Sequence, residues 1–237
     1  MAALLAAGGT LAVSGCQTAP HLMPATAPTP DMLRVRAAFE QWPHAPAAAI
    51  QGVIRPFFTT IHIANHRVTA SGILNIHSPR DFRITAVTEL GVILFDARFN
   101  WAGATVLRAM PGLGQLGTGV IENIVTDLST AFRPPPSLIG LKRDGNTLVL
   151  NQTEADTHEY RWKFDAKTGR AKILDVNLGL FDTLHVQYKG YTDEGWPREL
   201  VMSRGARFYT ISITFTDSPM AMRAAAPSGR AVGGGGS

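Results

Sequence analysis

Residues 158–165 read His-Glu-Tyr-Arg-Trp-Lys-Phe-Asp, and this stretch decides the fold. Its aromatic residues, Tyr160, Trp162 and Phe164, occupy every second position. The positions between them are charged: Glu159, Arg161, Lys163 and Asp165. Successive side chains of a β-strand point to opposite faces of the sheet, so this pattern predicts a strand with one buried face and one solvated face.

The same alternation recurs between residues 50 and 217, with Gly and Asp-Gly turn signals between the runs. We expect eleven strands, over residues 56–65, 67–77, 81–89, 91–99, 103–109, 146–152, 157–165, 170–177, 182–191, 197–203 and 207–217. The connections are short, which favours antiparallel pairing of successive strands as a meander.

Two helices are expected beside these strands. The first covers residues 31–41, with Asp31 as its N-cap. The second covers residues 116–132 and ends before three consecutive prolines, 134–136. Its apolar side carries Val120, Ile124 and Leu128, and its polar side Glu122, Asn123, Asp127 and Ser129. The predicted fold is mainly β with α: a single curved antiparallel sheet of eleven strands, a half-open β-barrel, capped by an amphipathic lid helix.

The single cysteine of this 237-residue chain excludes a disulfide framework and a cysteine-rich zinc module. Residues 1–15 are apolar, uncharged and too short to span a bilayer, as is typical of a signal peptide. They lead into Val13-Ser14-Gly15-Cys16, which resembles the lipobox of bacterial lipoproteins. That resemblance implies lipidation of Cys16, and Gln17 after it implies the outer membrane. The alternative is a buried structural cysteine.

The remaining segments follow from composition. Residues 16–30 are rich in proline, which predicts a tether. We expect residues 31–218 to form the half-barrel domain and residues 219–237 to form a flexible tail. The net charge of +4 comes from scattered residues, which argues against nucleic acid as a partner.

No constellation of residues predicts catalysis, a metal or a cofactor. Residues 112–117 match a dinucleotide-binding pattern, but three prolines and hairpins follow where a βαβ unit needs a parallel strand, so we interpret them as a hinge. His62 and His66 lie about 13 Å apart on an extended strand and, with His77, are expected to be solvated. A Gly-x-Ser-x-Gly elbow and a His-Glu-x-x-His motif are both absent from the sequence.

Two predicted hairpins carry a large apolar residue at the tip, where polar residues are usual. These are Leu90, in Thr88-Glu89-Leu90-Gly91, and Trp101. Either side chain folds back onto the sheet edge, or it points outward into a bilayer or along the path of an acyl chain.

The order of a lipobox, a tether, five strands, an amphipathic helix, a proline-rich loop and six strands resembles the LolA/LolB-like lipoprotein carriers and receptors. This resemblance implies a cavity that takes acyl chains, no cofactor, a place on the periplasmic face of the outer membrane, and a soluble periplasmic carrier as partner. Leu90 matches the protruding leucine of the receptor, although Glu89 stands where that family has proline. The cavity wall would comprise Phe82, Ile84, Phe95, Phe99, Trp162, Phe164 and Phe215.

The main hypothesis is therefore an outer-membrane-anchored lipoprotein for lipoprotein or lipid transfer, and two alternatives stay open. The chain could be a LolB-like paralogue with another apolar cargo. It could also be a structural or assembly lipoprotein with a filled core that binds a protein through its sheet surface.

Overall fold

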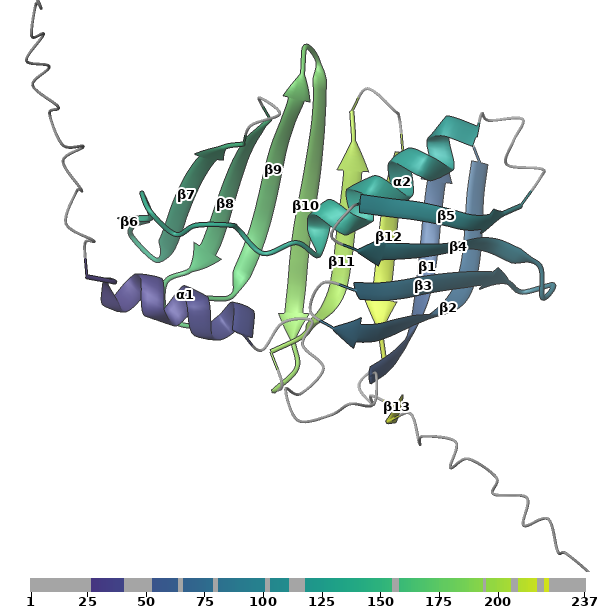
Figure 1. Ribbon diagram of the computed structural model, residues 1–237, viewed down its shortest axis with the longest axis horizontal. Helices are drawn as coiled ribbons and strands as arrows, with labels where there is room; N and C mark the ends of the chain where they lie inside the picture. The colour runs from purple at the N-terminus through teal and green to yellow at the C-terminus, as the bar shows by residue number, and fades with distance from the viewer. Residues whose placement is uncertain are drawn as a thin grey trace, which may run out of the picture.

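A computed structural model describes residues 27–40, 53–63, 66–78, 81–100, 103–110, 118–154, 158–193, 195–205, 209–216 and 220–221. The expectations for Cys16, residues 17–26 of the tether, residues 112–117, Trp101 and the side chain of His77 lie outside the described residues. The described residues form one large sheet and two helices, and Figure 1 shows that the sheet is curved. Its strands are β1 (Val53–Ile63), β2 (His66–Ser78), β3 (Asp81–Thr88), β4 (Ile93–Asn100), β5 (Gly103–Ala109), β6 (Lys142–Asp144), β7 (Thr147–Thr153), β8 (Glu159–Asp165), β9 (Ala171–Gly179), β10 (Asp182–Tyr191), β11 (Pro197–Arg204), β12 (Tyr209–Phe215) and β13 (Met220–Ala221).

The predicted curved antiparallel sheet is confirmed. All eleven expected strands are present, and the short strands β6 and β13 are additional. The strand order is β5-β4-β3-β2-β1-β12-β11-β10-β9-β8-β7-β6, with β13 beside β1. The expectation of one continuous meander is wrong, because the chain forms two meanders that join through β1 and β12. The long connection through the second helix leaves β5 and β6 at opposite edges of the sheet.

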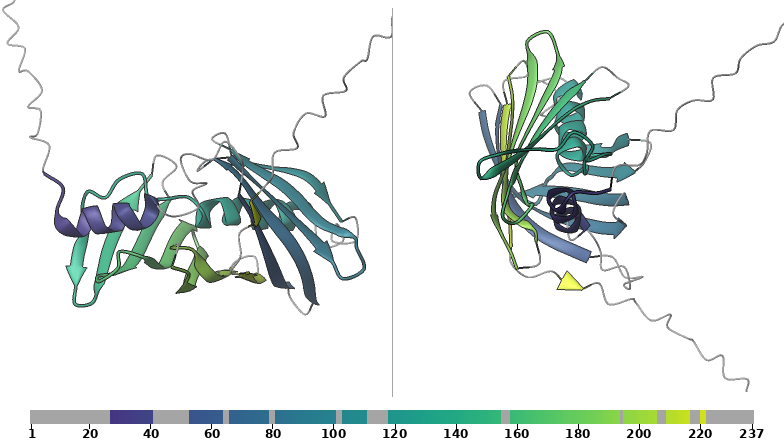
Figure 2. Two further views of the ribbon diagram at one scale, coloured as in Figure 1. Left: turned by 90° about the horizontal axis from the view of Figure 1, so that it is seen from below. Right: turned by 90° about the vertical axis from the view of Figure 1, so that its left-hand side faces the viewer.

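Both helices, α1 (Pro30–Glu40) and α2 (Thr118–Ala131), lie on the concave side of the sheet (Figure 2). The N-cap of α1 is Thr29 instead of the predicted Asp31. The Thr29 hydroxyl accepts a hydrogen bond from the Met32 amide at 3.3 Å, and Pro30 takes the first helical position, where its missing N–H is not needed. Neither helix in the described part of the chain is long and apolar enough to cross a membrane.

The core consists of the inward-facing residues of the strands and the sheet-facing side of α2. One position in this core requires glycine. A Cβ built on Gly72 of β2 would lie 2.4 Å from the ring of Phe57 and 2.4 Å from the carbonyl oxygen of Thr85. Phe57 and Ala86 are the register partners of Gly72 in β1 and β3, so the missing side chain gives the Phe57 ring its place against the sheet.

We expect Gly72→Ala to lower the free energy of unfolding by about 1–3 kcal/mol, because the added methyl group meets backbone and a buried ring. Urea denaturation measures this loss. Gly205→Ala is the matched control, since its Cβ would meet nothing within 4 Å, and it should change stability by less than about 1 kcal/mol. Equal stability of the two variants would contradict the close packing at Gly72.

Candidate functional site

Helix α1 lies across one half of the concave side, over the ends of β7, β8 and β9 (Figure 1). The side chain of Val35 is fully buried there, and the ring of Phe39 meets Trp162 and Phe164 edge-on, with centroids 5.7 Å and 5.8 Å apart. The side chain of Arg34 donates a hydrogen bond to the carbonyl of Ala166 at 2.9 Å. The aromatic side chains of β8 are therefore covered by the chain itself.

Helix α2 lies over the other half, against β4 and β5. Of the predicted lid residues, Ile124 and Leu128 are buried in the core and Val120 is half-buried at its margin. The hydroxyl of Tyr188 donates a hydrogen bond to the carbonyl oxygen of Ala131 at 2.8 Å. Because the last carbonyls of a helix have no partner within it, this bond satisfies one of them and fixes the end of α2 to β10.

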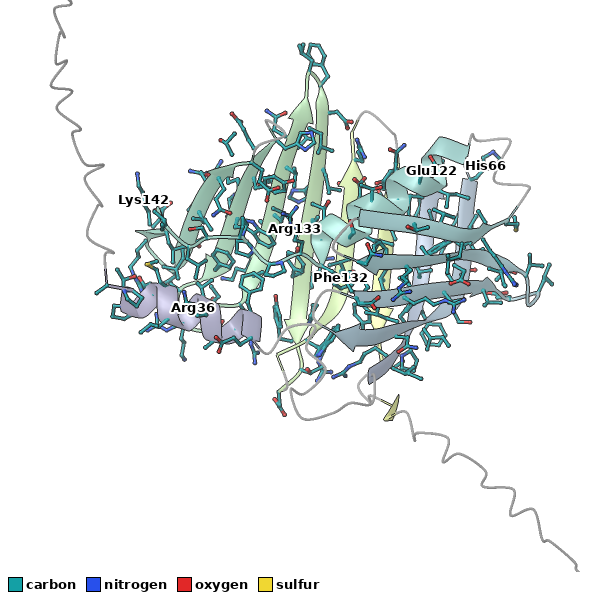
Figure 3. The ribbon with its side chains drawn as sticks, in the orientation of Figure 1. Arg36, His66, Glu122, Phe132, Arg133 and Lys142 are labelled. Atoms are coloured by element: carbon teal, nitrogen blue, oxygen red, sulfur yellow. The ribbon has the colours of Figure 1, made fainter. Side chains whose placement is uncertain are left out.

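A pocket of about 430 Å³ opens where α2 ends. Three phenylalanine rings form its apolar part: Phe82 and Phe99 lie with centroids 4.7 Å apart, and Phe82 and Phe132 lie 5.6 Å apart, edge to face. Figure 3 shows Phe132 and Arg133 side by side at this end of the helix. The whole lining is Phe82, Phe99, Asn100, Gly103, Ser129, Phe132, Arg133, Pro134, Pro135 and Pro136.

The rim of this pocket is charged on one side. The Arg133 side chain is mostly exposed and forms an ion pair with Glu154, with 3.2 Å between Nη1 and Oε2. Prolines 134–136 separate the pocket from a second space of about 230 Å³, which Arg36, Phe39 and Glu40 of α1 help to line. The three prolines thus form a strap between the two covered halves, and a hydrogen bond from Gln152 to the carbonyl of Ser137 holds its far end.

A buried ionic cluster fixes the middle of α2 to the sheet. Arg204 donates from Nη1 to both carboxylate oxygens of Asp127, at 2.9 Å and 3.0 Å, and from Nη2 to Asp182 at 2.7 Å. The hydroxyl of Tyr209 also donates to Asp127. Burial raises the pKa of Asp127 above its ordinary value, while the hydrogen bonds from Tyr209 and Arg204 oppose that rise. Burial likewise raises the pKa of Tyr209.

Asp127 corrects the sequence interpretation, which placed it on the solvent side of the helix. Its side chain is buried against the sheet, because Arg204 and Tyr209 supply the opposite charge and the donor that a buried carboxylate needs. Helical spacing could have shown this, because Asp127 lies three residues after the buried Ile124 and shares its side of the helix. The partners come from β11 and β12, which sequence spacing cannot bring to it.

The seven predicted wall residues are all buried, but they lie in different environments. Phe82 and Phe99 line the 430 Å³ pocket, and Trp162 borders a space of only about 10 Å³. The other four are packed in the core: Ile84, Phe95, Phe164 and Phe215. Phe132 and Arg133 were missed, since the sequence marks them only as the end of a helix before three prolines.

Leu90 lies at the tip of the hairpin between β3 and β4, where 91% of its surface is exposed. The backbone of this turn is tied by a hydrogen bond from the Gly91 amide to the Thr88 carbonyl at 2.9 Å. Of the two orientations that the sequence left open for the Leu90 side chain, the structure has the outward one. His62 and His66 are exposed, as predicted, but they do not share one strand: His62 lies on β1 and His66 on the adjacent β2, where it pairs with Ile63. Within the described ranges, no group of His, Cys, Asp or Glu side chains is arranged to hold a metal.

Replacing Asp127 by alanine should lower the free energy of unfolding by about 3 kcal/mol, because Arg204 then lacks one of its two carboxylate partners in a buried place. Tyr209→Phe removes one hydrogen bond and should cost about 1 kcal/mol. Lys189→Ala, which breaks an exposed pair with Glu199, is the control and should cost less than about 1 kcal/mol in the same urea titration. If Asp127→Ala costs no more than the control, the cluster does not anchor α2.

Comparison with known proteins supports this architecture. No family model and no curated protein matches the sequence. Among solved structures, the LolA superfamily protein NE2245 from Nitrosomonas europaea is similar, with a TM-score of 0.51 and 11% identity over 77% of this chain and 91% of that one. A DUF1329 family protein from Desulfovibrio piger is similar too, with a TM-score of 0.52 and 10% identity over 79% of this chain and 90% of that one. The predicted resemblance is confirmed at the level of architecture: the chain has the fold of LolA superfamily proteins.

Proposed function

We propose that this protein is a carrier that holds the acyl chains of a lipid or lipoprotein in the 430 Å³ pocket at the end of α2, and that it catalyses no reaction. The pocket itself carries this proposal. Its volume falls within the range of small-molecule sites, and its apolar part consists of Phe82, Phe99 and Phe132. It lies on the concave side of a LolA-type sheet, where the cargo would be shielded from water.

The chemistry of the pocket suits an amphiphile with an anionic head. Each methylene group that leaves water contributes about 0.8 kcal/mol, so apolar rings alone give an acyl chain useful affinity. Arg133 at the rim offers a cation to a phosphate or carboxylate, in exchange for its exposed pair with Glu154. The open rim lets cargo leave as well as enter, which a carrier needs.

The same proposal gives roles to two further residues. Cys16 would carry the lipid that anchors the chain to the periplasmic face of the outer membrane, with residues 16–30 as the tether. Leu90, exposed at its hairpin tip, would enter the membrane or meet the acyl chain during transfer. A soluble periplasmic carrier would supply the cargo.

One observation favours the alternative function, binding of a protein partner. A polar groove of about 440 Å³ crosses the outer face of β7 to β10 and includes Arg161, Asp175 and Asn177. Asp175 contacts the Nδ1 atom of His185 at 2.5 Å in the same region. If this chain bound a protein partner through the polar groove, its function would need no apolar cargo.

Blocking the pocket tests the carrier proposal. We expect the full-length Cys16→Ala protein to yield stoichiometric lipid on extraction and mass spectrometry and to bind a fluorescent fatty acid. Ser129→Trp places an indole in the pocket and should weaken binding of the fluorescent fatty acid at least about tenfold, which is 1.4 kcal/mol.

Thr126→Trp is the matched control, because it adds the same side chain to the exposed face of the same helix. It should bind the fatty acid like the parent. Absence of extractable lipid together with no fatty-acid binding would rule out the carrier and leave the protein-binding alternative.

The anchor has its own test. Cys16→Ala should move the protein from the membrane fraction to the soluble fraction, because the acyl chains that supply about 0.8 kcal/mol per methylene are lost. Fractionation of cells that express the natural and altered chains measures this. Retention of Cys16→Ala in the membrane fraction would contradict lipidation, without affecting the assay of the pocket.

A further inference from the structure

The hairpin between β9 and β10 carries two adjacent apolar side chains in full contact with solvent. Leu180 is 90% exposed and Phe181 is 91% exposed. Figure 1 shows this hairpin extending beyond the neighbouring strands at the top of the molecule. An exposed leucine and phenylalanine side by side at a projecting tip are unusual, because polar residues and glycine dominate such turns.

The backbone of the turn makes the phenylalanine more unusual still. Phe181 has a φ of 62°, and it is the one non-glycine residue with positive φ in the described ranges. Glycine, asparagine or aspartate commonly takes this conformation, whereas a bulky side chain costs roughly 1 kcal/mol there. The fold therefore bears a local cost at the position that presents an aromatic ring to solvent.

Backbone pairing, a hydrogen bond and an ion pair hold the base of the tip. Gly179 pairs with Asp182 across the turn, and its amide donates to the side chain of Asn177 at 3.2 Å. Asp182 is held in turn by Arg204, with 3.0 Å from Nε to Oδ1 and 2.7 Å from Nη2 to Oδ2. Because Arg204 also binds Asp127, the hairpin is tied to the same cluster that fixes α2.

The charges around the tip suit an apolar surface. Between Val176 and Leu184, Asp182 is the single charged residue of the sequence. The guanidinium of Arg204, which also pairs with Asp127, forms an ion pair with it, so the carboxylate next to Phe181 has a cationic partner within the protein. Such a tip can enter a nonpolar medium without carrying an unpaired charge into it.

From these observations we propose that Leu180 and Phe181 form a second membrane-contacting site, a wedge that inserts into the interfacial region of a lipid bilayer. A bilayer is favoured over a protein because the tip is a narrow projection. Two side chains bury far less than the roughly 800 Å² per partner that a stable protein interface requires. A fluid acyl layer accepts a small apolar projection without a matching cavity, as it accepts aromatic side chains at its interface.

This site is separate from Leu90 and goes beyond the proposed transport of cargo. Leu90 lies on the hairpin between β3 and β4, at the opposite half of the sheet, and Figure 1 shows the two hairpins pointing in different directions. The wedge would orient the body of the protein on the membrane whether or not the 430 Å³ pocket carries lipid.

Binding to phosphatidylcholine vesicles tests the wedge. Using the full-length Cys16→Ala chain removes the contribution of an acyl anchor to vesicle binding. Using vesicles without net charge removes the electrostatic contribution of the +4 protein charge. We expect cosedimentation that added salt does not abolish. Leu180→Ser combined with Phe181→Gly should weaken partitioning at least about tenfold. Glycine suits the positive φ of position 181, so this variant should melt at the same or a higher temperature, and the loss cannot come from unfolding.

Ile139→Ser is the control in the same assay, because it removes an apolar side chain that is 79% exposed elsewhere on the protein. It should partition like the parent. Phe181→Trp should in addition give a blue-shifted emission that brominated acyl chains quench, measured as a difference from the parent. A parent that does not bind vesicles, equal binding of the double variant, or an unquenched indole would each overturn the proposal.

Discussion

The pairing of β1 with β12 is the interaction on which the rest of the structure depends. Seven residue pairs, from Phe57 with Phe215 to Ile63 with Tyr209, join strands that lie about 150 residues apart in the chain. Without this ladder the chain would hold two separate meanders, each with an apolar face open to water. With it, one sheet curves around a common concave side, and each helix can cover one half.

That concave side is neither an empty barrel nor a solid core. Phe39 covers the aromatic residues of β8, and α2 covers β4 and β5, so most of the apolar surface is satisfied within the chain. The remaining space lies where α2 stops before the three prolines. Proline cannot continue the helix, so beyond Phe132 the pocket is lined by prolines 134–136 in place of a further helical turn. The pocket is thus a consequence of where the helix ends.

A single guanidinium connects α2 to the hairpin between β9 and β10. Arg204 binds Asp127 of α2 and Asp182 of the β9–β10 hairpin at once, while Tyr209 completes the contacts of Asp127. Displacing α2 would leave buried charges without partners, which is costly in a low-dielectric interior. This makes α2 a firmly held cover, and it couples the position of the helix to the hairpin that presents Leu180 and Phe181.

The sequence alone determined eleven of the thirteen described strands, the two helices and the alternation of inward residues such as Phe82 and Trp162, because these depend on local periodicity. Tertiary structure decided which of those residues meet free space: Phe82 lines the pocket, whereas Phe39 covers Trp162. It also decided the burial of Asp127 and the pairing of β1 with β12. Each of these depends on contacts between residues far apart in the chain, and neither residue type nor spacing along one strand encodes such contacts.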